Sequence, residues 1–100
     1  MQQMTLAEIV QDIHAMDEDL WHYESRYGLR TGYFIELYQA GQLHDEDSLE
    51  TRDYGDWAAC YEIKQHREEL LRKFSEQRLR QLRDDGDREF VLRTVGGKQL

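Results

Sequence analysis

Histidine and carboxylate side chains recur at helical spacing along this chain. His14, Glu18 and His22 lie four residues apart and would share one helix face, a plausible spacing for metal ligands. A di-iron helical bundle needs a Glu-x-x-His pair on each of two helices and two further Glu residues in the core. The chain offers only Asp19 with His22, and a second set contains no such pair: Glu62, His66 and Glu69. We interpret both sets as charged outer faces and expect no metal and no cofactor; a helical metal-dependent enzyme is the alternative.

Cys60 carries the only thiol in the sequence. A single cysteine excludes an internal disulfide and a cysteine-based zinc cluster. It lies between Trp57 and Ile63 on the apolar side of an expected helix, where a small buried thiol is the usual case. A nucleophilic cysteine needs an adjacent base and an exposed position, and the chain also lacks a Gly-rich phosphate loop. The sequence therefore predicts a protein that is not an enzyme.

Charge is distributed unevenly along the 100 residues, whose net charge is −8. Residues 1–62 carry 14 acidic and 3 basic side chains, whereas residues 63–100 carry 7 acidic and 10 basic ones. The negative overall field argues against nonspecific nucleic-acid binding, and the basic side chains that could form a patch are interleaved with Glu69 and Glu76: Arg72, Lys73, Arg78, Arg80 and Arg83. The acidic part should attract a basic protein or the chain's own basic half, unless it only keeps the surface solvated.

The size and hydropathy of the chain limit its architecture. One hundred residues fit one domain with a modest core, and we expect a helical domain over residues 1–86 followed by a C-terminal tail over residues 87–100. No apolar run is long enough to span a membrane, and the N-terminus MQQMTLAEIV lacks the basic and apolar regions of a signal peptide. A cytoplasmic protein with no membrane partner is therefore expected.

Apolar residues spaced alternately three and four apart predict a first helix over residues 5–27. Thr5 and Glu8 form a capping box at its start, and Gly28 ends it. Such a seven-residue repeat favours packing against a neighbouring helix, either of the same chain or of a second copy. The seam consists of Leu6, Ile9, Ile13, Met16, Leu20, Tyr23 and Tyr27.

A short second helix is expected over residues 31–40. Thr31 can cap its start and Gly41 can end it. About ten residues are marginal for an isolated helix, so it must dock through its aromatic side, with Ile35 and Glu36 facing outward. The acidic, polar stretch that follows, QLHDEDSLETRDYG, predicts the main loop.

The longest expected element is an unbroken helix over residues 56–84, capped by Asp56. At 1.5 Å per residue it would be roughly 40 Å long, whereas a compact domain of this size has a radius of gyration of about 13 Å. Part of it should therefore extend beyond any core. His66, Arg67 and Arg78 interrupt its apolar stripe. Either these side chains reach water from the edge of the seam, or Arg67 or Arg78 meets a carboxylate across an interface.

The pattern changes again after Gly86. Phe90, Val91 and Leu92 lie in a β-prone setting that suggests a short strand. Because the rest of the chain is helical, such a strand could either stay frayed or add to the sheet edge of another protein.

The stretch from Tyr23 to Glu62 resembles a group of small acidic helical bacterial proteins, common in cyanobacteria, that look like the antitoxin halves of toxin–antitoxin pairs. The resemblance is carried by YESRYGLRTGYFIELYQAG, an acidic spacer and DWAACYE, and its marks are Tyr27-Gly28, Phe34, Gly41, Asp47, Trp57 and Tyr61-Glu62. It implies a protein that neutralises a cognate basic, ribonuclease-like toxin by covering its active surface. An acidic surface can steer such a partner, and aromatic residues are the usual anchors of an interface.

We therefore expect an all-α protein whose three helices form a helical hairpin or bundle, with an acidic loop and a short β-prone tail. It is expected to act as a homodimeric, antitoxin-like module; the alternative is a homo-oligomeric coiled-coil adaptor without a toxin. A tryptophan at the start of a docked helix is more often part of the core, which is the competing interpretation of Trp57. The residues expected to contact the partner are Trp57, Tyr61, Glu62, Arg67, Phe74, Phe90 and Leu92.

Overall fold

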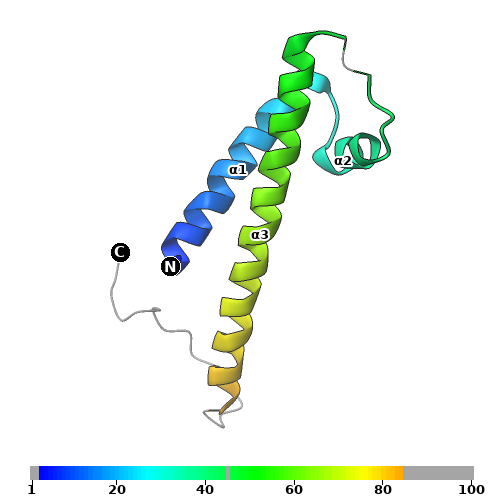
Figure 1. Ribbon diagram of the computed structural model, residues 1–100. Helices are drawn as coiled ribbons and strands as arrows, with labels where there is room; N and C mark the ends of the chain where they lie inside the picture. Colours follow the sequence, from blue (N-terminus) through cyan, green and yellow to red (C-terminus); the bar gives the residue numbers. More distant parts are fainter. Residues whose placement is uncertain (1–2, 45, 85–100) are drawn as a thin grey trace.

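The computed structural model describes residues 3–44 and 46–84, which form three helices (Figure 1). α1 spans Leu6–Tyr27, α2 spans Thr31–Gln39 and α3 spans Ser48–Asp84. The expected all-α class is confirmed for these ranges, and the tail with Phe90 and Leu92 lies outside them. Within the same ranges, no helix combines the length and the apolar character that a membrane crossing requires.

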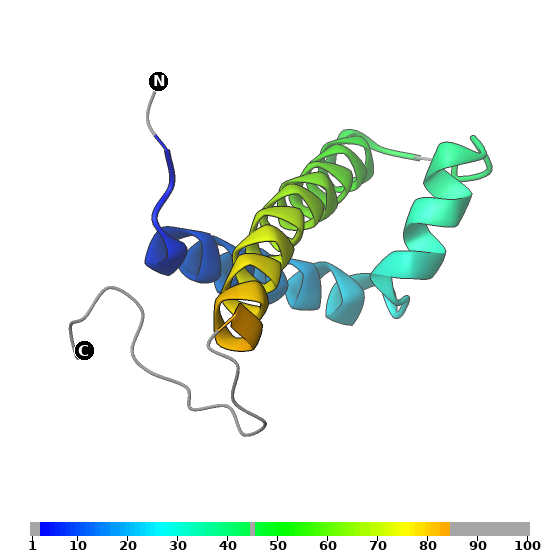
Figure 2. The ribbon, with the colours of Figure 1, turned by 90° about the horizontal axis from the view of Figure 1, so that it is seen from below.

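α1 and α3 run side by side in opposite directions, and α2 lies at the end where the chain connects them (Figures 1 and 2). Arg26, near the end of α1, faces Asp53 near the start of α3, whereas Asp12 faces Arg67 further along. α3 continues well past the first residue of α1 (Figure 1). The radius of gyration is 18.4 Å, well above the about 13 Å of a compact domain of this length, in agreement with the expected protrusion.

Both predicted ends of α1 are confirmed. The Thr5 hydroxyl accepts a hydrogen bond from the Glu8 backbone N–H at 3.1 Å, and the Glu8 carboxylate accepts one from the Thr5 backbone N–H at 2.8 Å. Gly28 adopts a left-handed conformation with φ 65° and donates its N–H to the Glu24 carbonyl. The whole predicted seam of α1 is buried or partly buried, because it faces α3 of the same chain.

Gly28→Ala is expected to lower the free energy of unfolding by about 1 kcal/mol, because a left-handed φ is unfavourable for a residue with a Cβ atom. A Cβ at this position meets no atom within 4 Å, so the backbone accounts for the whole cost. The matched control is Gly32→Ala, which has equal space but lies inside α2 without a positive φ, and which should be neutral or stabilising. Urea denaturation measures both variants, and equal losses would contradict this account.

The predicted start of the long helix is wrong. α3 begins at Ser48 instead of Asp56, and the Asp47 carboxylate caps it by accepting the Glu50 backbone N–H at 2.8 Å. A glycine inside a helix costs about 1 kcal/mol relative to alanine, which made the segment before Asp56 look like a loop. The helix nevertheless continues through Gly55, because this turn places Asp53 and its neighbours against α1.

Two expectations for α2 are also wrong. Thr31 is not its N-cap: Arg30 occupies that position without a side-chain hydrogen bond, and Thr31 is buried. Ile35, expected to face outward, is 8% exposed and belongs to the core. α2 therefore docks through Thr31, Phe34 and Ile35, whereas Tyr33 and Tyr38 of its expected aromatic docking side are 62% and 41% exposed. The buried residues of this core are Leu20, Phe34, Ile35 and Trp57.

Candidate functional site

Trp57 lies at the centre of an aromatic cluster in which α1, α2 and α3 meet. Its side chain is 1% exposed and stacks on Phe34, with ring centroids 3.8 Å apart and an interplanar angle of 3°. Tyr23 and Tyr27 stack beside it at 5.7 and 5.8 Å. A partner could not reach this indole without opening the three-helix junction, so the structure places Trp57 in the core.

A chain of hydrogen bonds joins the same indole to both other helices. Trp57 Nε1 donates to Thr31 Oγ1 at 3.0 Å, and the Thr31 hydroxyl donates onward to Glu24 Oε2 at 2.9 Å. The Thr31 backbone N–H also donates to Glu24 Oε2, at 2.8 Å. The Glu24 carboxylate on α1 thereby accepts a hydrogen bond from a backbone N–H at the start of α2, where a side-chain N-cap usually provides the acceptor. These contacts fix α2 relative to the hairpin that α1 and α3 form.

Asp53 is a buried carboxylate that the sequence analysis assigned to a loop. It is 5% exposed, and its Oδ2 accepts hydrogen bonds from Arg26 Nη1 and from the Tyr27 hydroxyl, each at 2.6 Å. The hydrogen bonds from Tyr27 and then Arg26 hold the pKa of Asp53 below its usual value, although burial acts against them. Burial, followed by the bond to Asp53, raises the pKa of Tyr27 to about 12. The network is a structural anchor between α1 and α3.

Two ion pairs flank the hairpin further along. Arg67 Nε donates to Asp12 Oδ2 at 2.9 Å, and Lys64 Nζ lies 2.6 Å from Asp17 Oδ1. Arg67 was expected either to reach water or to contact a carboxylate across an interface. The structure shows contact with a carboxylate, which belongs to α1 of the same chain. Ion pairs with this degree of exposure contribute about 0–1 kcal/mol each to the free energy of unfolding. Their main effect is therefore to set the register in which α1 packs along α3.

The remaining residues expected to contact a partner differ in exposure. Tyr61 packs against the core, Glu62 is exposed, and Phe74 is 37% exposed beyond the core. Phe90 and Leu92 lie outside the described residues. Of the seven expected residues, the described part of the chain therefore presents Glu62 and Phe74 most openly.

The candidate metal ligands of α1 and α3 do not converge on one site within the described residues. His14, His22 and His66 are exposed, and no group of three or more His, Cys, Asp or Glu side chains within residues 3–44 and 46–84 could hold a metal ion. The Cys60 thiol donates weakly to Asp19 Oδ2 at 3.9 Å. Burial and then the nearby Asp19 charge raise the pKa of this thiol, which keeps it in its unreactive protonated form.

The structure also exposes two aromatic residues that were not expected at a partner surface. Trp21 on α1 is 61% exposed and Tyr33 on α2 is 62% exposed. The signal for Trp21 was present in the seam, because the residue directly after Leu20 must point away from α3. Asp17 and Glu18 precede Trp21 by one helical turn. An exposed aromatic residue in acidic surroundings is therefore available on the half of the hairpin that carries most of the carboxylates.

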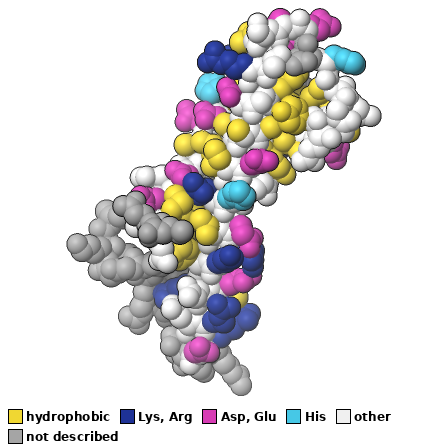
Figure 3. Space-filling model, viewed as in Figure 1, with side chains coloured by type: hydrophobic (Ala, Val, Ile, Leu, Met, Phe, Trp, Pro, Cys, Tyr) yellow, Lys and Arg dark blue, Asp and Glu magenta, His cyan; other side chains and the backbone are white. Residues whose placement is uncertain are grey.

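The space-filling view shows how the charges are separated (Figure 3). Asp and Glu side chains are spread over the whole visible face, whereas most of the visible Lys and Arg side chains lie over the C-terminal part of α3. Comparison of the chain with protein-family models, with curated proteins and with solved structures found no match. The two oppositely charged parts of the surface are thus the main candidates for function.

Proposed function

We propose that this chain is a protein-binding module of the antitoxin type, which neutralises a basic, ribonuclease-like toxin by covering its active surface. The observation that supports it most directly is the exposure of Trp21 and Tyr33, at 61% and 62%, on the acidic half of the hairpin. Tryptophan, tyrosine and arginine dominate the energetically important positions of protein interfaces. Large aromatic side chains held outward on a fixed helix are suited to such a role.

Electrostatics favours a basic partner for this half of the molecule. Residues 1–62 carry 14 acidic and 3 basic side chains, and a field of one sign accelerates the encounter with an oppositely charged protein. An RNA-cleaving protein needs a cationic surface to hold phosphates, so an acidic cover would occupy the surface that its substrate requires.

The rigidity of the acidic half supports binding without a large ordering cost. The stack of Phe34 on Trp57 and the buried Asp53 network fix α1, α2 and the start of α3 relative to one another. A surface that is already ordered loses less conformational entropy on association. Trp21 and Tyr33 therefore project from a preformed platform.

Trp21→Ala is expected to weaken the complex with the toxin by at least about tenfold, because truncation of an aromatic interface anchor costs more than 1 kcal/mol. The toxin candidate is the basic product of the adjacent gene, co-expressed with the full-length chain. Isothermal titration calorimetry of the purified proteins and relief of growth inhibition are the two measurements.

The matched control is Leu79→Ala, which removes an exposed apolar side chain from the opposite, basic end of α3. It should leave the affinity for the toxin unchanged. If the adjacent gene product neither forms a complex nor loses its toxicity, or if both variants bind equally, the proposal fails.

A homo-oligomeric coiled-coil adaptor without a toxin is the rival function. The observation that favours it is the stretch of α3 that extends beyond α1 with Phe74 and Leu79 exposed by 37% and 39%. Sedimentation equilibrium over a wide range of protein concentrations decides this point, since a strict monomer refutes both the adaptor and the expected homodimer.

A further inference from the structure

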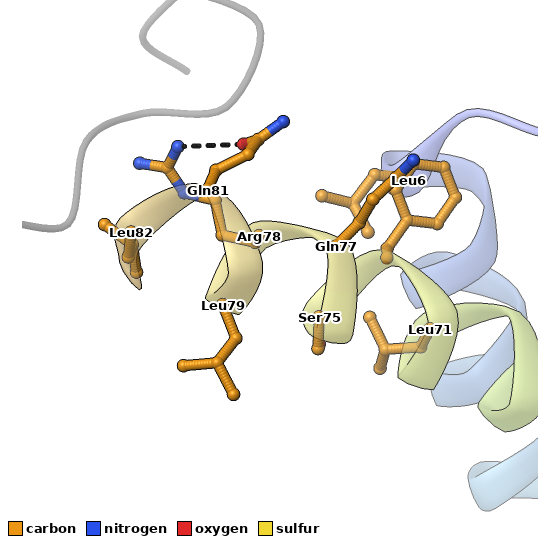
Figure 4. Close-up of a pocket in the computed structure, with 9 residues that line it drawn as sticks. Leu6, Leu71, Ser75, Gln77, Arg78, Leu79, Gln81 and Leu82 are labelled. Carbon is orange, nitrogen blue, oxygen red and sulfur yellow. Dashed lines mark hydrogen bonds between the residues drawn. The ribbon is translucent and has the colours of Figure 1, made fainter. Parts of the chain in front are cut away.

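The last four turns of α3, residues 71–84, form what we call the overhang. α3 continues there beyond the N-terminal end of α1 (Figure 1). A groove of about 520 Å³ runs along it. In Figure 4, Leu71, Ser75 and Leu79 point to the same side of the helix, as expected from their spacing of four residues. The principal lining residues are Leu6, Leu71, Phe74, Ser75, Leu79 and Leu82.

The groove continues the side of α3 that α1 covers. Residues of α3 at alternate spacings of four and three face α1, as shown by the contacts of Asp53, Trp57, Lys64 and Arg67 with its side chains. Spacings of three and four residues continue into the overhang through Leu71, Phe74 and Arg78, and Leu82 follows four residues later, where strict alternation would place Gln81. The stripe that can pack against a helix therefore extends at least to Arg78, and α1 occupies only the first part of it.

α1 itself shows which kind of helix the stripe accepts. Its apolar seam packs on α3, while Asp12 and Asp17 reach the basic side chains Arg67 and Lys64 that lie within the stripe. The occupant of the stripe is thus an amphipathic helix with carboxylates beside its apolar seam. Arg78 takes the corresponding place in the overhang, where it lines the groove.

The charge of the overhang points to the same chemistry. Arg72 forms ion pairs with Glu69 and Glu76, and Arg78 lines the groove. The overhang carries two acidic side chains, Glu76 and Asp84, and five basic ones: Arg72, Lys73, Arg78, Arg80 and Arg83. An acidic occupant gains from this field, whereas a basic one is repelled.

We propose that the overhang binds an acidic amphipathic helix of a protein partner, which packs on α3 in line with α1. Such a partner has apolar residues at a three–four spacing, with Glu or Asp beside them. This site lies at the end opposite the acidic surface proposed to bind a toxin and has the opposite charge, so the chain would hold two different proteins at its two ends.

Two other occupants match the groove less well. A second copy that paired overhang with overhang would bring five basic side chains of each chain together, which opposes association. The chain's own residues 85–100 carry three acidic and three basic side chains, so they offer no net charge to complement the overhang. Both are outcomes of the test below.

The test uses full-length protein and two fluorescent synthetic peptides of three heptads, with the same leucine seam and with either Glu or Lys at the flanking positions. Fluorescence anisotropy should show binding of the Glu peptide at least about tenfold tighter than that of the Lys peptide, and weaker at high salt. Equal binding of both peptides, or no binding of the Glu peptide because the chain's own tail fills the groove, would overturn the proposal.

Three variants locate the peptide on the overhang. Leu79→Glu should weaken binding of the Glu peptide at least about tenfold, and Arg78→Glu should reverse the preference for Glu over Lys. Leu79 is 39% exposed, so helix content by circular dichroism should not change. Tyr33→Glu alters a 62% exposed side chain at the other end and is the matched control.

If Leu79→Glu and Tyr33→Glu bind alike, the site is misplaced. If sedimentation shows a dimer that Leu79→Glu dissociates, the occupant is a second copy and the proposal is wrong. These outcomes are independent of the toxin experiment, which depends on Trp21 and the acidic half, so either proposal can fail without the other.

Discussion

Trp57→Ala is expected to lower the free energy of unfolding by about 3–5 kcal/mol, the range for truncating a fully buried large aromatic residue. The indole is 1% exposed and contacts Phe34, Tyr23 and Tyr27 through ring stacking. Its removal leaves a cavity where α1, α2 and α3 meet. Because small domains are stable by only about 5–15 kcal/mol, this variant should be partly unfolded under mild conditions.

Urea denaturation followed by circular dichroism measures this loss, and Trp21→Ala is the matched control. Trp21 is 61% exposed, and its truncation should change the free energy of unfolding by no more than about 0.5 kcal/mol. Both variants replace a tryptophan by alanine in the same protein, so a difference between them reports the effect of burial and not of residue type. Similar losses would mean that the aromatic cluster does not form the core.

The contrast between the two tryptophans shows what could be predicted from the sequence. Trp57 follows the apolar spacing of α3, and Trp21 lies one position away from the seam of α1, so their different exposure was available from the pattern. The ends of α1 were also predictable, because Thr5, Glu8 and Gly28 act on the backbone within a few residues. Signals of this kind are local and need no knowledge of the fold.

The start of α3 could not be predicted in the same way. Gly55 and the acidic residues before it disfavour a helix by local propensity, yet Asp53 and Tyr54 gain contacts with α1 and α2 only if the helix includes them. Such contacts join residues 26 and 27 positions apart for Asp53 and about 20 for Tyr54, and packing of this kind outweighs propensity. For the same reason, the exposure of Tyr33 could be established only once the docking of α2 was known.

Asp53→Ala is expected to lower the free energy of unfolding by about 3 kcal/mol, because it removes two hydrogen bonds to a buried carboxylate, each contributing about 1.5 kcal/mol or more. Arg26 and Tyr27 donate these bonds at 2.6 Å. The matched control is Asp56→Ala, one turn along α3, where the side chain is exposed and lies 4.0 Å from Arg52. The control should change stability by about 0.5 kcal/mol or less.

The pH dependence of stability gives Asp53→Ala a second, independent test. The folded state holds the pKa of Asp53 below its usual value, so the stabilisation is complete above the unfolded pKa of about 3.9 and disappears as the pH falls through the lower folded pKa. The variant should therefore lose less stability on acidification than the unmodified chain.

At alkaline pH the dependence of stability on pH has the opposite sign. Tyr27, with its pKa raised to about 12, contributes stability below about pH 10 that is lost towards pH 12. Removing the carboxylate should return the Tyr27 titration, followed by phenolate absorbance, part of the way towards 10, since burial is the larger cause and remains. An unchanged acid profile together with an unchanged Tyr27 titration would show that Asp53 does not join α1 to α3 in solution.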